Sequence, residues 1–315
     1  MATDELYDAI IIGGGPAGLT AGLYCKRAAL KTVLFEKGLP GGQIAISKEV
    51  ENYPGLENIT GFDLAEKMVH HAGLFGLDIR REEVSEIVSG APYHAVRLAT
   101  GERLRSRALI LAAGGSVRKL GVPGEAEYLG AGVSYCATCD GFFFRDKTVI
   151  VVGGGDTAAE EALYLSKITR KVSLVHRGNT LRAGKILQDR LTAAPEIDFI
   201  WNTVVKEING DGKHVVSVTC EDIRTGVKKI IPTDGVFVCI GYSPNNQLIP
   251  PGVTMNELGF VITDDRCETS VPGIFAVGDL RKKFANQIVV AAADGCIAAL
   301  AAAHYVEISK GTIGQ

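Results

Sequence analysis

The chain has no large excess of charge of either sign. Its 315 residues include 33 lysines and arginines and 36 aspartates and glutamates, which gives a formal net charge of -3. Proteins that bind nucleic acid or an anionic membrane usually carry a basic patch, so we expect neither partner here. Hydrophobic residues make up 46% of the chain and charged residues 22%, as in ordinary globular proteins. The length predicts about two domains.

Long apolar runs are scarce as well. We expect no apolar stretch to reach the roughly 18 residues of a membrane span. The segment 288–306 comes nearest, but Asp294 and the small residues around it predict a packed core helix. The short apolar run at residues 9–12 follows no basic segment, so it does not resemble a signal peptide. These features predict a soluble, cytoplasmic protein.

The cysteines do not follow the pattern of a secreted disulfide framework, because they number seven and five of them are scattered singly. Cys136 and Cys139 form the Cys-x-x-Cys pair of the chain. A zinc site normally needs four ligands, and no second such pair or histidine pair is present, so we expect no metal. A structural disulfide across so short a loop stabilises little and is improbable in a reducing cytoplasm. A redox role is the interpretation that remains.

A strand, a glycine turn, a helix and a second strand are predicted twice, at residues 8–38 and 148–178. The first two glycines of each turn let the backbone approach a pyrophosphate, which then lies at the N-terminus of the helix. A single such turn is weak evidence, but both copies have the strand and helix context that the motif requires. The turns predict cofactor contacts at Gly13, Gly15, Pro16, Ala17 and Gly18, and at Gly153, Gly155, Asp156 and Thr157.

The residues that end the second strands differ between the two copies. Glu36 can accept hydrogen bonds from a ribose 2′-hydroxyl and would repel a 2′-phosphate. At the equivalent site, His176 and Arg177, with Arg182 close behind, could neutralise a 2′-phosphate. We therefore expect FAD at the first copy and NADPH at the second. The alternative for the two arginines is a merely solvated surface.

Two hydrophobic segments that end in glycine or one residue after it, 109–115 and 236–242, are each followed by a stretch containing proline and glycine. We interpret these stretches as crossings between domains. A third such segment, which ends at Gly278–Asp279, is expected to return to the first domain. The prediction is an α/β protein with two Rossmann-like nucleotide-binding domains, the second inserted into the first. The FAD-binding domain would comprise residues 1–117 and 246–315, and the NAD(P)H-binding domain, which carries the cysteine pair, residues 118–245.

The sequence resembles the low-molecular-weight, bacterial-type thioredoxin reductases over essentially the whole chain. The resemblance is carried by the first glycine turn, "GGQ" at 41–43, "EVENYPG" at 49–55, "CATCDGFF" at 136–143, "GGGDTAAEEALYL" at 153–165 and "SVPGIFAVGD" at 270–279. It implies a homodimeric FAD enzyme that moves electrons from NADPH to the cysteine pair and then to thioredoxin or a thioredoxin-like protein. It implies FAD contacts at Glu36, Gly42, Gln43, Asn52, Gly278, Asp279, Gln287 and Ile288.

The resemblance also implies roles at the redox pair. Cys139 would face the flavin, and Cys136 would attack the disulfide of the partner. Asp140 would exchange a proton with the departing thiolate, although a turn or helix-capping acid is the simpler alternative. Phe142 and Phe143 would contact the partner, since exposed aromatic side chains make strong anchors. On composition alone, at least one of the three phenylalanines at 142–144 is expected in the core.

The chain departs from the family at the predicted 2′-phosphate site. The family usually has His-Arg-Arg and a third arginine there, whereas this chain has Gly178 after Arg177. Loss of one cation leaves NADH possible as the donor, and reduced ferredoxin or a deazaflavin stays open. A flavin-dependent thiol oxidase and a nucleotide-sensing module are further alternatives. Arginines of the family are also replaced by Ala131 and Asn286.

Overall fold

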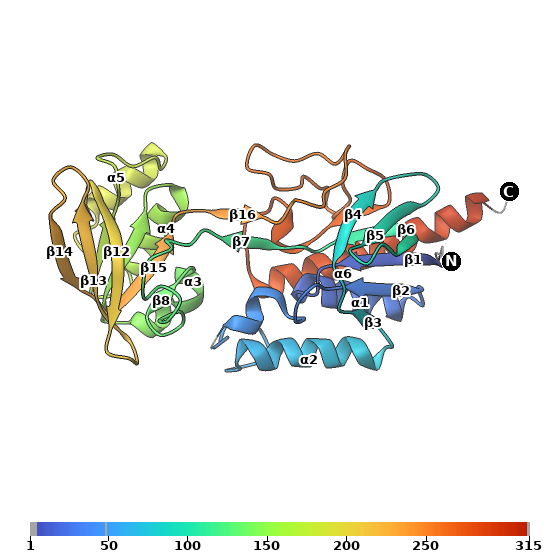
Figure 1. The fold of residues 1–315 in the computed structure, drawn as a ribbon, viewed down its shortest axis with the longest axis horizontal. Coiled ribbons are helices and arrows are strands. Elements are labelled where there is room, and N and C mark those ends of the chain that lie inside the picture. Colours follow the sequence, from blue (N-terminus) through green and yellow to red (C-terminus); the bar gives the residue numbers. More distant parts are fainter. Residues whose placement is uncertain (1–4, 48, 314–315) are drawn as a thin grey trace. The chain divides into compact units, whose positions relative to one another are not determined.

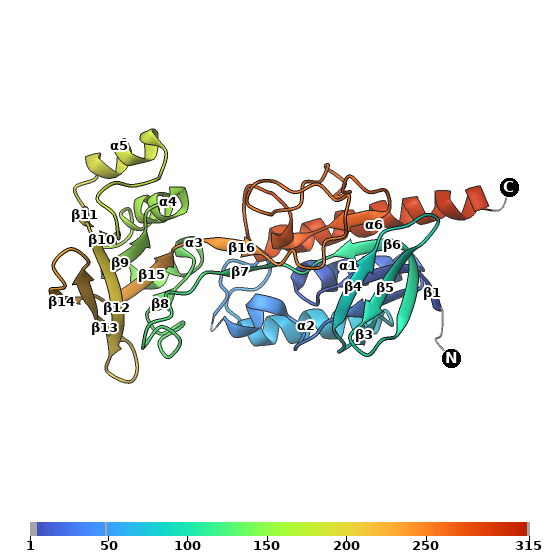
Figure 2. The ribbon, with the colours of Figure 1, turned by 45° about the horizontal axis from the view of Figure 1, so that its top comes forward.

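The computed structural model describes residues 5–47 and 49–313. The chain forms two compact units, one of residues 1–116 with 243–315 and one of residues 117–242 (Figures 1 and 2). We call them the outer and the inserted unit. The predicted α/β class, with one unit inserted into the other, is confirmed. The unit boundaries follow residues 116 and 242, where the sequence suggested 117 and 245.

The outer unit is built on a seven-stranded sheet with the order β3-β2-β1-β6-β5-β4, in which β17 also pairs with β6. Strands β1, β2, β3, β6 and β17 run parallel, whereas β4 and β5 are antiparallel to their neighbours. The strands are β1 (Glu5–Ile12), β2 (Thr32–Phe35), β3 (Asp78–Arg80), β4 (Val84–Val88), β5 (His94–Leu98), β6 (Arg103–Leu111) and β17 (Ile274–Ala276). Strand β2 is buried along its whole length, as expected for apolar strands covered on both faces.

The helices of the outer unit are α1 (Pro16–Arg27), α2 (Gly61–Leu74) and α6 (Ile288–Ile313), with 3-10 turns η1 (Gly42–Ile46) and η3 (Gly278–Leu280). Helices α1 and α6 pack against one face of the sheet through small residues, such as Ala17, Ala21 and Ala298. The other face packs against the segment 248–280, which includes Val253 and Val261. The glycine turn that follows the carboxyl end of β1 and the one that follows the carboxyl end of β17 both lie beside the start of α1.

The inserted unit has a five-stranded parallel sheet with the order β11-β10-β9-β15-β8 and a separate three-stranded antiparallel sheet. The first contains β8 (Val133–Ser134), β9 (Thr148–Gly153), β10 (Lys171–Val175), β11 (Ile197–Ile200) and β15 (Gly235–Cys239). The second contains β12 (Thr203–Gly210), β13 (Val215–Asp222) and β14 (Lys228–Pro232). The helical elements are α3 (Ala137–Asp140), η2 (Gly141–Phe144), α4 (Asp156–Leu165) and α5 (Lys185–Ala193).

The chain crosses between the units twice, along β7 (Gly115–Val117) and β16 (Tyr242–Pro244). These two strands pair with each other as a two-stranded sheet. Ser116 donates a hydrogen bond to the side chain of Asn245 at 2.9 Å, and the N–H of Arg118 donates to the carbonyl of Gly241 at 2.9 Å. The crossings therefore lie in the two proline- and glycine-containing stretches that the sequence suggested.

The expectation that no stretch is long and apolar enough for a membrane span is wrong for α6. In the described part of the chain, residues 288–311 of this helix pass that test, with a mean hydropathy of 1.6. The many alanines, valines and isoleucines outweigh Asp294 in the average. One such helix is weak evidence for a membrane, because core helices pass the same test. Here Asp294 is buried and forms an ion pair with Arg281 at 2.8 Å, which suits a helix packed on its own domain.

Candidate redox and nucleotide sites

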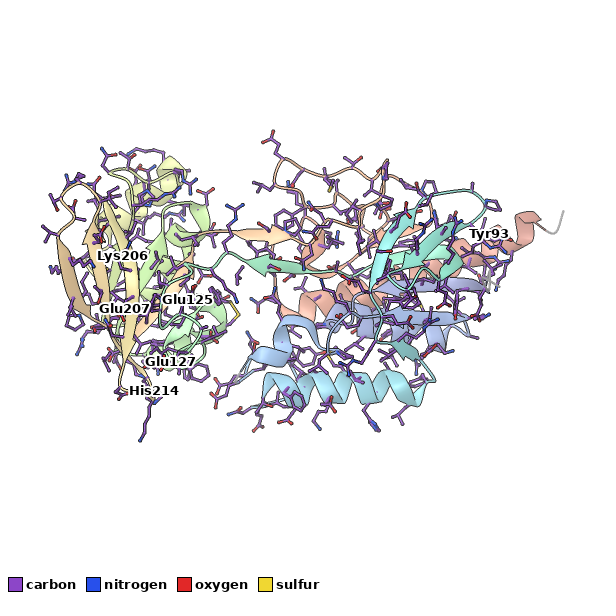
Figure 3. All side chains as sticks on the ribbon, viewed as in Figure 1. Tyr93, Glu125, Glu127, Lys206, Glu207 and His214 are labelled. Carbon is purple, nitrogen blue, oxygen red and sulfur yellow. A yellow bond between two sulfur atoms is a disulfide. The ribbon has the colours of Figure 1, made fainter. Side chains whose placement is uncertain are left out.

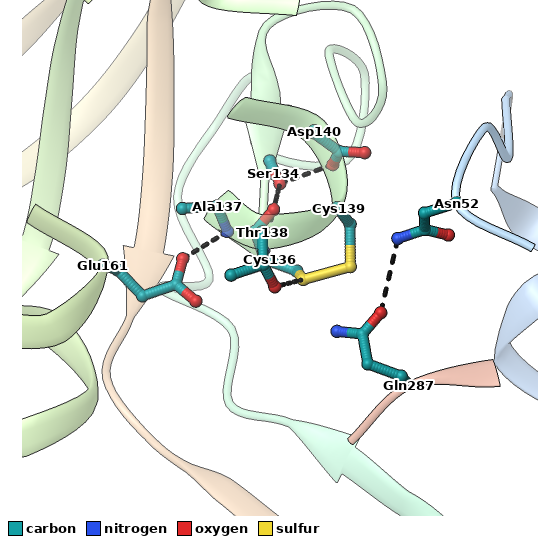
Figure 4. Close-up of a disulfide and its surroundings, with 9 residues drawn as sticks. All are labelled: Asn52, Ser134, Cys136, Ala137, Thr138, Cys139, Asp140, Glu161 and Gln287. Atoms are coloured by element: carbon teal, nitrogen blue, oxygen red, sulfur yellow. Dashed lines mark hydrogen bonds between the residues drawn. A yellow bond between two sulfur atoms is a disulfide. The ribbon is translucent and has the colours of Figure 1, made fainter. Parts of the chain in front are cut away.

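Cys136 and Cys139 form a disulfide at the turn that follows β8, with Cα atoms 5.3 Å apart (Figure 4). Cys136 is the N-cap of the short helix α3, and Cys139 lies one helical turn later. A helical turn of this kind brings side chains three positions apart onto the same face. Cys136 is half-buried and Cys139 is exposed. The predicted pairing of the two cysteines is confirmed.

A buried serine holds the predicted acid against this turn. Ser134 donates a hydrogen bond to the Asp140 carboxylate at 2.5 Å and accepts one from the N–H of Cys136 at 3.0 Å. Burial raises the pKa of Asp140, and the hydrogen bond from Ser134 opposes that rise. Asp140 therefore lies next to the disulfide with an increased tendency to keep a proton. The sequence analysis missed Ser134, since one serine before a cysteine carries no recognisable pattern.

A second carboxyl group, which the sequence analysis also missed, contacts the same turn. Glu161 of α4 accepts a hydrogen bond from the N–H of Ala137 (Figure 4). Burial raises the pKa of Glu161 to about 7, the Ala137 hydrogen bond opposes that rise, and the charges of Asp140 and Glu160 add to it. In the sequence, Glu161 looks like an ordinary polar residue of an amphipathic helix. Only the packing of α4 against α3 shows its position.

Glu125, labelled in Figure 3, connects the residue before the redox pair to the segment that follows the first crossing. Its buried carboxylate accepts hydrogen bonds from the N–H groups of Leu120 and Gly121, at 2.8 and 2.7 Å, and from the hydroxyl of Tyr135 at 3.1 Å. Burial and the nearby charge of Glu125 raise the pKa of Tyr135 to about 12. Because Tyr135 directly precedes Cys136, this buried acid is hydrogen-bonded to the residue next to the disulfide.

The first glycine turn has the tight packing that a dinucleotide site needs. A Cβ atom on Gly13 would lie 2.3 Å from the carbonyl oxygen of Ala112, and one on Gly18 would lie 1.9 Å from that of Gly13. Gly15 is the N-cap of α1 and supplies no side-chain hydrogen bond to the helix, so the first N–H groups of α1 stay available for an anion. Pro16 begins the helix, which its fixed φ and missing N–H suit.

The structure places three of the other predicted FAD-contact residues, Glu36, Gly42 and Gly278, beside this turn. The Glu36 carboxylate accepts hydrogen bonds from the N–H groups of Gly14 and Gly38, at 2.7 and 2.8 Å. A Cβ atom on Gly42 would lie 3.2 Å from the Cα of Gly15, and one on Gly278 would lie 3.1 Å from the Cβ of Ala17. The other residues predicted to contact FAD have neighbours within the protein: Gln43 donates to the carbonyl of Gly115, Asn52 donates to Gln287 at 3.3 Å, Asp279 pairs with Lys283, and Ile288 packs near Ile44.

The second glycine turn is equally tight, but His176 packs against it where Glu36 packs against the first turn. A Cβ atom on Gly153 would lie 2.4 Å from the carbonyl oxygen of Cys239, and one on Gly154 would lie 2.3 Å from the imidazole of His176. His176 is buried on the turn, and the centres of its ring and the Trp201 ring are 6.2 Å apart in a T-shaped pair. It therefore forms part of the wall of the turn, whereas Arg177 is exposed.

The loop before α5 folds back over the same turn. The N–H of Arg182 donates to the carbonyl of Gly154 at 2.7 Å, and the Asp156 carboxylate accepts from the N–H of Gly184 at 2.7 Å. The side chain of Arg182 is exposed and starts from backbone fixed beside the turn. Gly155 is the N-cap of α4 and gives it no side-chain hydrogen bond, and Thr157 is exposed in the first turn of the helix. This arrangement leaves a helix N-terminus and two cations on one side of the inserted unit.

The comparisons with known proteins agree with this geometry. The model of the pyridine nucleotide-disulphide oxidoreductase family matches residues 7–295. The chain belongs to this family. It is 47% identical over 313 residues to the thioredoxin reductase of Bacillus subtilis (strain 168), covering 99% of each chain. It is also 47% identical over 312 residues to that of Listeria innocua, covering 98% of this chain and 97% of the relative.

A solved structure gives the same result. The thioredoxin reductase of Streptococcus pyogenes MGAS5005 is 44% identical and superposes with a TM-score of 0.94, over 97% of this chain and 100% of the other. Within the pyridine nucleotide-disulphide oxidoreductases, the chain groups with the low-molecular-weight thioredoxin reductases. As a member of this family it is an oxidoreductase, and the family resemblance inferred from its motifs is confirmed.

The three phenylalanines after the redox pair have different environments. Phe142 is 61% exposed, with the guanidinium carbon of Arg145 5.5 Å from the centre of its ring. Phe143 is partly buried against the core of the inserted unit, and Phe144 is buried, 5.1 Å from the ring of Phe237 in an edge-to-face pair. The expectation that at least one of the three lies in the core is confirmed by Phe144. Contact of Phe142 and Phe143 with a partner stays a prediction.

The described residues, 5–47 and 49–313, contain no group of three or more histidine, cysteine or acidic side chains arranged to hold a metal ion. The five cysteines outside the pair are free thiols, and Cys25, Cys220, Cys239 and Cys267 are buried. Burial raises the pKa of the Cys220 and Cys267 thiols to about 11, which makes them poor nucleophiles. The disulfide pair is therefore the site to which redox chemistry is assigned.

Proposed function

We propose that the chain is a thioredoxin-disulfide reductase that uses NADPH and FAD to reduce its Cys136–Cys139 disulfide and then thioredoxin or a thioredoxin-like protein. The observation that carries the proposal is the disulfide itself. In the sequence it lies between two glycine turns, each at a helix N-terminus, and the chain matches thioredoxin reductases over 97% to 99% of its length. When bound, FAD would accept a hydride from NADPH and supply two electrons to the disulfide.

The outer unit fits FAD. The uncapped N-terminus of α1 and the glycines 13, 15 and 18 would hold the pyrophosphate, with Pro16 and Ala17 in the first turn. Glu36 has free lone pairs beside its two backbone hydrogen bonds and would accept from the ribose hydroxyls. Gly42 and Gly278 leave room beside the turn, because neither has a Cβ atom. Gln43, Asn52, Asp279, Gln287 and Ile288 would complete the site.

The inserted unit fits a pyridine nucleotide. The N-terminus of α4, with Gly153, Gly155, Asp156 and Thr157, would hold the pyrophosphate. Arg177 and Arg182 would neutralise a 2′-phosphate, while His176 forms the wall of the turn. Gly178 stands where the family has the second arginine of His-Arg-Arg, and a Cβ atom there would lie 3.0 Å from the imidazole of His176, so this position has little room for that cation. Because Arg177 and Arg182 remain at the site, NADPH is the proposed donor. NADH is the alternative, and the experiment below distinguishes the two donors.

The protein residues have defined parts in the dithiol chemistry. Two electrons and two protons convert the disulfide into two thiols, and transfer to the partner reverses this change at Cys136 and Cys139. Asp140, held by Ser134, would give a proton to the departing thiolate and take it back on the return. Phe142, exposed three positions after Cys139, and Phe143 would contact the partner protein. The five other thiols lie outside the pair, which suits a reducing, cytoplasmic location.

The deciding experiment mixes the oxidised holoenzyme anaerobically with NADPH or with NADH and follows the visible flavin absorbance. We expect fast bleaching with NADPH and slower bleaching with NADH. Equal bleaching with both would show that the enzyme accepts either nucleotide, as expected if Gly178 removes a contact to the 2′-phosphate. Slow bleaching with both would contradict the nicotinamide donor and favour a ferredoxin or deazaflavin.

Thioredoxin reduction is tested separately with cysteine variants. Cys139→Ser should keep the bleaching by NADPH but lose at least about 1,000-fold of thioredoxin turnover, because no disulfide can then carry the electrons. Cys296→Ser is the matched control, since this half-buried thiol is not part of the pair, and it should keep the native turnover. Full turnover in Cys139→Ser would overturn the proposed electron path.

A further inference from the structure

Glu161 is the charged group of α4 that contacts the redox turn from behind. Its carboxylate accepts a hydrogen bond from the N–H of Ala137, and this N–H belongs to the peptide bond that joins Cys136 to Ala137 (Figure 4). Ala137 is completely buried, so water does not compete for its N–H. The negative charge of Glu161 therefore lies one peptide group away from the cysteine that is assigned to attack the partner.

The ionisable groups packed around Glu161 are acids. Helix α3 supplies Asp140 and the two cysteines, β15 supplies the buried Cys239, and α4 itself supplies the exposed Glu160. Strand β9 has the sequence TVIVVG and supplies no ionisable group. The only charged residue of β10, Lys171, is exposed and pairs with Asp198, while the charged residues of α5, Lys185, Asp189 and Arg190, are exposed. A thiolate at Cys136 would thus meet other negative charge on this side.

We propose that Glu161 is a positioning residue of the dithiol, which anchors the redox turn through Ala137 and sets by its charge how much thiolate the reduced Cys136 carries. The proposal rests on the proposed function in assigning Cys136 as the attacking thiol. Reduction leaves two thiols, and a thiolate forms when Cys136 then loses its proton to water. An ionised Glu161 disfavours this loss, whereas a protonated Glu161 does not. The proton on Glu161 would therefore control the nucleophile.

The test measures the thiolate directly and needs neither NADPH nor thioredoxin. The holoenzyme is reduced with dithiothreitol, freed of reductant without air, and treated with short pulses of iodoacetamide between about pH 5.5 and pH 9, a range that spans the ionisation of carboxyl and thiol groups. Iodoacetamide is uncharged, so its reaction rate follows the thiolate fraction. Peptide mass spectrometry then gives the rate of modification at Cys136. Native protein is compared with Glu161→Gln, in which an amide oxygen still accepts from Ala137.

We expect the rate in Glu161→Gln, divided by the native rate, to be close to one near pH 5.5 and to rise to about threefold or more at pH 8, where the native carboxylate is ionised. Glu160→Gln is the matched control. It removes the same charge from an exposed neighbour on α4, where solvent screens it, so its ratio should stay close to one at every pH. A ratio that is the same at every pH, or that falls below one at pH 8, would overturn the proposal.

The native protein gives a second reading in case Glu161→Gln does not fold. Since two linked ionisations act on Cys136, its native rate should rise with pH over a wider range than a single-proton titration. A curve of single-proton width would overturn the proposal. Failure of the proposed function is distinguishable, because it would appear as absent flavin bleaching or absent thioredoxin turnover while the alkylation rates keep their dependence on Glu161.

Discussion

The Ser134 side chain links the acid Asp140 to the backbone of the redox turn. Its hydroxyl donates to the Asp140 carboxylate at 2.5 Å and accepts from the Cys136 N–H at 3.0 Å. Burial favours the protonated form of Asp140, so this group stabilises the fold most at a pH below its ordinary pKa of 3.8. That contribution is lost as the pH rises through the higher, folded pKa. The hydrogen bond from Ser134 limits the rise, because it favours the ionised form.

Ser134→Ala should therefore raise the pKa of Asp140 further, because the hydrogen bond that favours the ionised form is lost. The pKa is measured from the pH dependence of disulfide reduction in a single turnover with NADPH, in which the limb assigned to Asp140 should move to higher pH. Ser166→Ala is the control, because its hydroxyl donates to the carbonyl of Leu163, outside the redox turn. An unchanged pH profile in Ser134→Ala would show that the proton is held elsewhere.

Among the helices and strands, the packing of α6 on α1 depends on a missing side chain. A Cβ atom on Gly295 would lie 2.1 Å from the carbonyl oxygen of Ala17 and 3.0 Å from the N of Ala21. Gly295→Ala should push the two helices apart and lower the stability by about 1–3 kcal/mol. Since α1 carries the predicted FAD turn, we also expect weaker FAD retention. Thermal unfolding of the holoenzyme, together with release of flavin fluorescence, measures both.

The same helix provides the control. Gly311 lies in α6 with no atom within 4 Å of a Cβ, so Gly311→Ala should be neutral or should stabilise the helix by up to about 1 kcal/mol. If Gly295→Ala were as stable as native protein, the close contact between α1 and α6 would not be needed for stability, and the role of Gly295 would have to be sought elsewhere.

The elements also show what the sequence could and could not predict. Strand–turn–helix units are local, so the turns at Gly13 and Gly153 could be recognised from the glycine spacing together with the predicted strands and helices around it. The Cys136–Cys139 pair could be predicted because the Cys-x-x-Cys motif is local as well, and no metal ligands or secreted disulfide framework accompany it. Glu161 and Ser134 contact the turn only through packing between elements, and their letters carry no periodic signal. The expectation for α6 was wrong for a different reason. One charged residue, Asp294, lowers the mean hydropathy of a long apolar helix only slightly, whether or not it forms a buried ion pair.

For the whole molecule, the resemblance predicts a homodimer, and the surface of α6 supports it. Val289, Ile297 and Leu300 are 42%, 40% and 55% exposed in the single chain, although the helix packs on α1 along its other side. Exposed apolar side chains along one helix are typical of an interface between subunits. The oxidised holoenzyme should therefore have a mass by light scattering of twice the 33.4 kDa of one chain.

Leu300→Glu should convert this dimer into a monomer, or raise its dissociation constant at least about 100-fold, because a charge would then be buried without a partner. Gly311→Glu adds the same charge to α6 at a position with open space around it and should leave the mass unchanged. A native mass of one chain would contradict the homodimer outright. A dimer in both variants would place its interface away from Leu300, and the exposed apolar residues of α6 would then need another explanation.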